Sequence, residues 1–133
     1  MAAFNKFNKF TEDVLNGVHN FSTNTFVIAL TNVAPVATNS ILADLTQISY
    51  TNLSSRDLTG VSVSQTGGVS TVNVSNLVLT ASGTVGPFRY AAIYNDSTVN
   101  KNLICWYDRG QSDTLLSGDT MTFDFPNEIF DLT

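Results

Sequence analysis

The stretch that decides the fold is GPFRYAAIYNDSTVNKNLICWYDRGQSDTLLSGDTMTFDFP, residues 86–126. It contains two runs rich in aromatic and β-branched residues, 88–94 and 103–107, on either side of a polar loop. A third run, 120–125, follows a glycine-aspartate turn signal. Apolar runs of this length, separated by turn residues, are typical of antiparallel strands that are covered on both faces. The stretch therefore predicts a three-stranded meander at the centre of a β-rich core.

Shorter strands are predicted upstream of this stretch. Large apolar residues stand at every second position over 25–31, and valine alternates with serine over about 61–64. The glycine pair Gly67-Gly68 marks a hairpin turn after the second of these runs. The segment 41–48 fits either one or two helical turns or a packed connection, and 49–57 reads as turns. A period of two predicts a strand at both places, and the polar alternate positions predict that the second strand is half-buried.

The alternation continues from Val72, but its phase slips before Leu77. One extra residue near 75–76 would explain the slip as a β-bulge. Counting this strand, the chain has about seven strands at regular spacing, which indicates an antiparallel β-sandwich or a partly open barrel. We therefore predict an all-β fold.

The first twenty residues follow a helical period instead. Apolar residues at spacings of three, four and one share one helical face: Phe7, Phe10, Val14, Leu15 and Val18. Gly17 can end a helix in the left-handed conformation. We predict one short helix over about 7–17.

Phe4, Phe7 and Phe10 form the candidate interface. They stand three residues apart at a chain terminus, where apolar surface needs a covering partner. Two alternatives remain open: the segment 1–20 packs on its own sandwich, or it docks on a neighbouring subunit. On the docking alternative, deleting residues 1–10 leaves the sandwich folded and weakens assembly.

Length and charge restrict the other classes of function. The 133 residues are enough for one domain, 1–133, with a single core. The net charge is −5 and the six basic residues are scattered, so the clustered cations that bind phosphate are missing and no nucleic-acid partner is expected. The charged fraction of 13% gives a polar surface with few charges.

A single cysteine, Cys105, excludes an intrachain disulfide and a cysteine-based zinc site. Its apolar neighbours predict a buried small hydrophobe. There is no 18-residue apolar run and no apolar stretch typical of a signal peptide, so we expect synthesis in a cytoplasm and no membrane partner.

No residue pattern predicts catalysis, a metal site or a cofactor. The one histidine, His19, has no nucleophile motif around it and is expected to be structural or on the surface. The acidic residues near the C-terminus stand mainly at predicted turns, where aspartate serves the backbone: Asp96, Asp108, Asp113, Asp119, Asp124, Glu128 and Asp131. The aromatic residues Tyr90, Tyr94, Trp106 and Tyr107 could stack sugars, but at strand spacing they are expected in the core. We predict a protein that is not an enzyme.

The chain resembles a family of small virion structural proteins of tailed bacteriophages. The resemblance lies in FTEDVLNGVHNF at 10–21 with NTFVIALTN at 24–32, in the Ala34-Pro35 pair leading to LADL at 42–45, and in FRYAAIYND, WYDRG and GDTMTFDF within 88–125. The three stretches that contain these segments, 10–32, 34–45 and 88–125, together span just over half of the chain. The sequence departs from the family at 49–55, where related proteins often carry a Gly-Tyr and a glycine pair.

The resemblance implies a β-rich head component without catalytic residues. It favours a capsid decoration or cement protein, made in the host cytoplasm, that binds the major capsid protein on the virion surface as a homo-oligomer and stabilises the head. The alternative is a tail-associated or baseplate-associated module that binds a receptor or carbohydrate through Tyr94, Trp106 or Tyr107.

Overall fold

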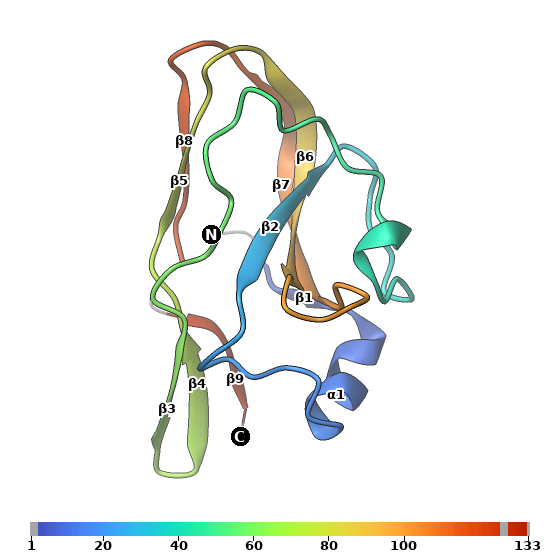
Figure 1. Cartoon of the computed structure of the whole chain (residues 1–133), viewed down its shortest axis with the longest axis vertical. Helices are drawn as coiled ribbons and strands as arrows, with labels where there is room; N and C mark the ends of the chain where they lie inside the picture. Colours follow the sequence, from blue (N-terminus) through green and yellow to red (C-terminus); the bar gives the residue numbers. More distant parts are fainter. Residues whose placement is uncertain (1–2, 126–127, 133) are drawn as a thin grey trace.

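The computed structural model describes residues 3–125 and 128–132, and its fold is all-β. The largest sheet has four antiparallel strands, in the order β1 (Asn5–Lys6), β7 (Leu103–Leu115), β6 (Val85–Asn95) and β2 (Phe26–Thr31). Figure 1 shows these strands as one layer. The long hairpin of β6 and β7 confirms the pairing predicted from the two aromatic runs, with Ala92 opposite Trp106.

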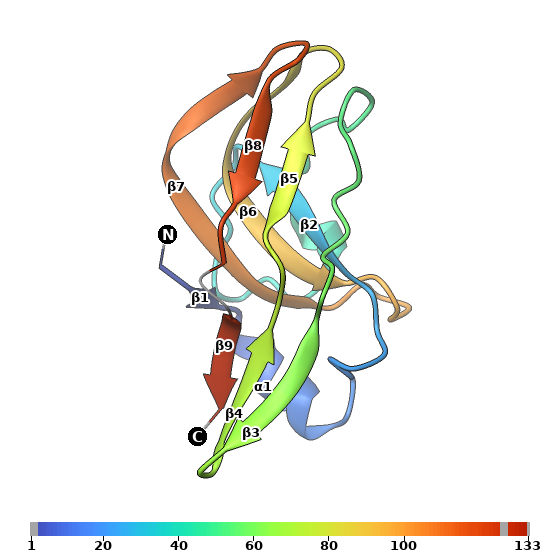
Figure 2. The same ribbon diagram turned by 90° about the vertical axis from the view of Figure 1, so that its left-hand side faces the viewer.

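Two smaller sheets form the second layer. One pairs β5 (Leu77–Thr80) with β8 (Thr120–Phe123), and the other places β4 (Val69–Asn73) between β3 (Ser62–Thr66) and β9 (Glu128–Leu132). Figure 2 shows the two small sheets end to end in front of the large one. Among the described residues no strand pairing joins the two layers, so the fold is an open two-layered arrangement and not a closed barrel.

The core lies between the layers, and a second cluster covers the outer face of the large sheet. Ile28 and Leu30 of β2 belong to the inner core, whereas Val27 and Ala29 belong to the outer cluster. Successive side chains of a strand point to opposite faces of the sheet. Both faces are covered at β2, and every residue of this strand is therefore buried.

The outer edge of β2 is covered by the segment that follows it. The Ile28 N–H donates to the Arg56 carbonyl at 3.0 Å, and the Ile48 N–H donates to the Leu30 carbonyl at 3.0 Å. The sequence left 41–48 open between helical turns and a packed connection. The structure has a 3₁₀ turn in it, η1 (Leu42–Asp44). The Asp44 carboxylate accepts hydrogen bonds from the backbone of Ser40 and Ile41, which lowers the pKa of Asp44.

The helix is shorter than predicted. It is α1 (Asn8–Leu15), since Phe7 has an extended backbone and lies just before the first turn. Gly17, with φ +73°, follows the end of the helix as expected; its N–H donates to the Val14 carbonyl, and the Val18 N–H donates to the Asp13 carbonyl. This pair of bonds is the Schellman motif, in which a left-handed glycine satisfies the last carbonyls of a helix.

The predicted three-stranded meander is wrong in its third strand. β8 pairs with β5 in the other layer, with Leu77 opposite Phe123, and not with β7. The turn before β8 is attached to the end of β5, because the Gly118 N–H donates to the Ala81 carbonyl and the Ala81 N–H donates to the Asp119 carbonyl. These bonds direct the chain across to the second layer.

The predicted β-bulge near 75–76 is also wrong. β4 ends at Asn73 and β5 begins at Leu77, so the phase slip marks the passage from one small sheet to the other. In this gap the Ser75 N–H donates to the Thr59 carbonyl, and the Asn76 side chain accepts from the Phe125 N–H. The backbone between the strands is therefore paired with other segments.

Candidate functional site

The N-terminal segment crosses the end of the large sheet and reaches both of its faces. β1 pairs with β7, placing Lys6 opposite Cys105. Phe7 then packs in the outer cluster, with its ring centroid 4.6 Å from that of Trp106. Phe10, on the first turns of α1, enters the core between the layers and meets the Phe130 ring at 5.2 Å.

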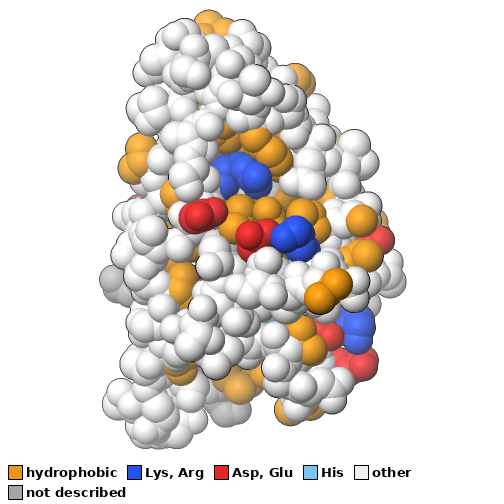
Figure 3. Space-filling view, in the orientation of Figure 1, with side chains coloured by type: hydrophobic (Ala, Val, Ile, Leu, Met, Phe, Trp, Pro, Cys, Tyr) orange, Lys and Arg blue, Asp and Glu red, His pale blue; other side chains and the backbone are white. Residues whose placement is uncertain are grey.

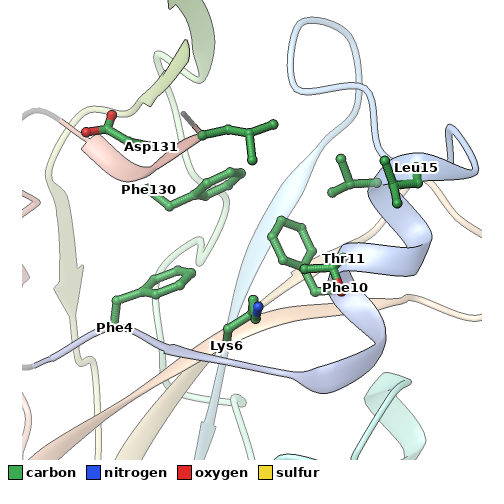
Figure 4. Close-up of a pocket in the computed structure, with 9 residues that line it drawn as sticks. Phe4, Lys6, Phe10, Thr11, Leu15, Phe130 and Asp131 are labelled. Carbon is green, nitrogen blue, oxygen red and sulfur yellow. The ribbon is translucent and has the colours of Figure 1, made fainter. Parts of the chain in front are cut away.

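An apolar groove of about 350 Å³ lies between this segment and β9. Its apolar side chains come from both ends of the described chain: Phe4, Phe10, Val14, Leu15, Phe130 and Leu132. Figure 4 shows Phe4, Phe10 and Phe130 converging in it, with Leu15 on the far side. Several of these groups remain accessible, since Phe4 is 37%, Leu15 87% and Leu132 59% exposed.

Lys6, Thr11 and Asp131 supply the polar groups of this groove. The Asp131 carboxylate accepts a hydrogen bond of 2.6 Å from the Thr71 hydroxyl. The groove is therefore lined mostly by apolar side chains with few charged groups, as the core of a protein interface is.

Of the three residues predicted for an interface, the structure leaves one accessible. Phe7 and Phe10 are buried in the chain's own clusters, and Phe4 lines the groove. Deleting residues 1–10 would remove these two buried aromatic side chains. The deletion is therefore expected to destabilise the fold, and not to leave the sandwich folded as the docking alternative predicted. Of the three candidate residues, Phe4 therefore remains available to contact a neighbouring subunit, together with the other residues that line the groove.

The sequence reasoning missed the contribution of β9 to the groove. Phe130 and Leu132 stand at alternate positions in β9 and both line it. The apolar Phe130 and Leu132 on either side of Asp131 were the available signal. Leu15 was placed on the apolar helical face, but its side chain is the most exposed of those in the groove.

His19 lies among phenylalanine rings and beside a buried amide. Its ring is 5.6 Å from Phe10 and 5.9 Å from Phe21, between centroids. Its Nδ1 accepts a hydrogen bond of 3.0 Å from the Asn95 side-chain amide, so the proton of the neutral ring is on Nε2, which is buried and has no partner among the described residues. Burial lowers the pKa of His19, and the charge of Asp13 opposes this shift.

Stability is expected to fall as the pH drops below about 6.5, because the unfolded chain then binds a proton at His19 that the folded chain resists. The loss begins at the ordinary histidine pKa and continues to the lower pKa of the folded state. Denaturant unfolding at about pH 7.5 and about pH 5.5, on the two sides of an unperturbed histidine pKa, measures the change. In a His19→Gln variant this slope is expected to flatten, and an unchanged slope would assign it to other groups.

Most of the acidic side chains that the structure describes belong to ion pairs or turns. Asp96 pairs with Lys101, Asp108 with Arg89 and Asp113 with Arg109, while Asp119 accepts from the Leu116 N–H at a turn. No group of three or more potential metal ligands is assembled within 3–125 and 128–132. Asp124 is exposed, and the side chain of Glu128 lies outside what the structure describes.

The aromatic residues of the β6–β7 hairpin mostly belong to the packed clusters. Tyr94 and Tyr107 are buried, and Trp106 is half-buried against Phe7. Tyr90 is also half-buried, with the Arg89 guanidinium 5.4 Å from its ring centroid. A flat row of exposed rings, which carbohydrate stacking requires, is not formed by these four residues.

Cys105 is fully buried, as predicted. Burial raises the pKa of its thiol to about 12. The thiol therefore stays protonated at neutral pH and is a poor nucleophile.

The basic side chains are dispersed and mostly paired. Five of the six contact acidic side chains, a carbonyl or a ring within the chain: Lys9, Arg56, Arg89, Lys101 and Arg109. Figure 3 shows one face of the molecule, on which the few charged side chains of opposite sign lie near one another. This face therefore has no extended positive patch to which a polyanion could bind.

Comparison with protein-family models, curated proteins and solved structures gives no match to this chain. No described helix has both the length and the apolar character needed to cross a bilayer. The interpretation of function therefore depends on the geometry of the groove and on the sequence resemblance.

Proposed function

We propose that the chain is a non-enzymatic structural protein of a tailed-bacteriophage head, a decoration or cement protein that binds the major capsid protein. The observation that carries the proposal is the apolar groove between the N-terminal segment and β9, in which Phe4, Leu15 and Leu132 are exposed. An exposed apolar patch with a polar border is the kind of surface that binds another protein. The resemblance to phage virion proteins supplies the class of partner.

Binding at this groove would stabilise a head by linking neighbouring capsid subunits. A contact of about 800 Å² on each partner is a standard protein interface. One groove supplies only part of that area, but many copies on a lattice engage it together, and multivalent binding raises the total affinity without new contacts. A modest site of this kind therefore suits a protein that resists the internal pressure of packaged DNA.

A Phe4→Asp variant tests this proposal. Placing a carboxylate in the apolar groove is expected to reduce binding to expanded heads that lack this protein by at least about tenfold, the usual effect of removing an aromatic anchor. Co-sedimentation of the purified protein with such heads measures the binding. The matched control is Val99→Asp, which adds the same charge on a fully exposed loop.

Two outcomes would contradict the proposal. One is that the wild-type chain does not bind heads at micromolar concentration. The other is that Phe4→Asp binds as well as Val99→Asp while unfolding at the same denaturant concentration. The control keeps net charge equal in the two variants, so a difference between them reports the groove.

The alternative, a carbohydrate-binding module of the tail or baseplate, has less support. Its proposed platform residues Tyr94 and Tyr107 are buried. Only Trp106 of that set is partly accessible, and it packs on Phe7. Stacking a sugar on Tyr94 or Tyr107 would require the hydrophobic clusters to open.

A further inference from the structure

The β3–β4 hairpin ends in an open strand. Figures 1 and 2 show it extending from the lower end of the molecule, with β3 at the edge of its sheet. Every residue of β3 is exposed, including Val63 at 47%, and no other described strand lies on its outer side. Unpaired backbone groups along such an edge are a template for another strand.

The other described edges are covered or adjoin acidic residues. The segment containing Ile48 and Arg56 bonds to the edge of β2, and β1, which has only two residues, lies on part of β7. The edge strand β5 is covered at its end, where Ser54 exchanges hydrogen bonds with Thr80. β8 is flanked by Asp119 and Asp124, and β9 contains Glu128 and Asp131. Pairing two copies of β8 or of β9 antiparallel would bring acids near acids, which costs free energy.

β3 differs because its surroundings in the sequence carry no charge. Residues 58–88 contain no Asp, Glu, Lys, Arg or His, although the chain as a whole has a net charge of −5. The acids of the same sheet are on β9, and β4 lies between β9 and β3. The edge strand β5 lies in the same uncharged stretch, but Ser54 bonds to its end. Of the edges that no segment covers, β3 therefore brings two copies of this acidic chain together with the least repulsion.

The hairpin geometry fixes which backbone groups of β3 are free. Thr66 and Val69 flank the two-residue turn Gly67-Gly68, whose φ angles of +59° and +86° suit a type I′ turn. Residues on either side of such a turn form a hydrogen-bonded pair, and the pairs alternate along the ladder. The N–H and C=O groups of Val63 and Gln65 consequently point away from β4.

We propose that β3 pairs antiparallel with β3 of a second copy of this chain, about a two-fold axis at Ser64. In this register Val63 of each copy lies opposite Gln65 of the other and exchanges both backbone hydrogen bonds with it. The uncharged strand SVSQT presents the same groups to its copy, so the pairing is self-complementary. This interface is separate from the groove and goes beyond the proposed binding to heads.

The interface is small, so the dimer is expected to be weak. Contacts below the standard size are typical of transient association. Sedimentation velocity from about 10 µM to about 1 mM covers the range in which such a complex dissociates. The wild-type chain is expected to shift from monomer to dimer across this range.

A Ser64→Lys variant tests the register. Its two lysines would face each other at the axis, and the dissociation constant is expected to rise at least about tenfold because like charges at an interface repel. Two controls accompany it: Ser64→Thr keeps a neutral hydroxyl, and Val99→Lys adds the same charge on a distant exposed loop. Both controls are expected to dimerise as the wild type does.

Amide hydrogen exchange of the wild-type chain gives a test without substitution. The Val63 and Gln65 amides are expected to exchange more slowly at high than at low concentration, whereas those of Ser62, Ser64 and Thr66 are protected by β4 at both. A chain that stays monomeric throughout, or a dimer that Ser64→Lys leaves intact, overturns the proposal. Phe4→Asp is expected to leave dimerisation unchanged, so a failure of head binding and a failure of β3 pairing are told apart.

Discussion

Replacing Phe7 by alanine is expected to lower the free energy of unfolding by about 3–5 kcal/mol, the usual cost of truncating a fully buried phenylalanine. Phe7 has no exposed surface and packs against Trp106 on the outer face of the large sheet. Its N–H also donates to the Ile104 carbonyl, which continues the pairing of β1 with β7. The loss of packing therefore falls where the N-terminal segment is attached to the sheet. Urea unfolding monitored by tryptophan fluorescence measures it.

The matched control for Phe7 is Phe4, three residues earlier in the same segment. Phe4 is about one-third exposed and has one side in the groove, so Phe4→Ala is expected to cost less than about 1 kcal/mol of stability. Equal losses in the two variants would contradict the burial of Phe7. Equal losses would also return both residues to the candidate interface.

The pairing at the centre of the fold could be predicted from the sequence because the sequence signals for it are local and strong. The runs that became β6 and β7 are apolar on both faces, and a polar turn separates them. The end of α1 was predictable for the same reason, since Gly17 can adopt the left-handed conformation within one turn of the last helical residue. Alternation and turn chemistry act over a few residues, so a single sequence is enough to read them.

The second half of β7 could not be read in this way. Its residues 108–114 are mostly polar and therefore lack the apolar alternation of a strand. Ion pairs in this region, Arg89 with Asp108 and Arg109 with Asp113, satisfy the polar side chains at its surface. The pairing partner of β8 could not be predicted for a different reason. A turn signal indicates that the chain reverses direction, but it does not indicate with which strand the next segment pairs.

The groove depends on contacts between the two ends of the chain. Phe4 and Phe130 meet with ring centroids 6.0 Å apart, although almost the whole sequence separates them. The spacing of the N-terminal phenylalanines predicted apolar surface at that end, but the surface is completed by β9. Periodicity cannot indicate such a pairing, because it reports which face of an element is apolar and not what lies opposite.

Replacing Asn95 by alanine is expected to lower the free energy of unfolding by about 3 kcal/mol, because it removes three hydrogen bonds made by a fully buried amide. The Asn95 side chain has no exposed surface and donates to His19 Nδ1 at 3.0 Å and to Asn24 Oδ1 at 2.9 Å. Its oxygen accepts from the Ser97 N–H at 2.9 Å. One amide thus links the segment after α1 to the end of β6, and Asn100→Ala, at an exposed position of the same loop, is the control.

A double-mutant cycle separates this link from the general cost of losing a buried side chain. If the Asn95 amide stabilises the fold through His19, the loss of unfolding free energy caused by Asn95→Ala is expected to be at least about 1 kcal/mol smaller in a His19→Ala background. The reason is that the acceptor that Asn95→Ala leaves unsatisfied, His19 Nδ1, is absent from that background. Strictly additive losses would contradict a direct coupling. The coupling is also expected to weaken once the pH falls below the lowered pKa of His19 in the folded chain, because a protonated imidazole no longer accepts the amide hydrogen bond. Repeating the cycle at neutral and acidic pH therefore tests whether the bond between His19 and Asn95 holds the N-terminal segment against the sheet.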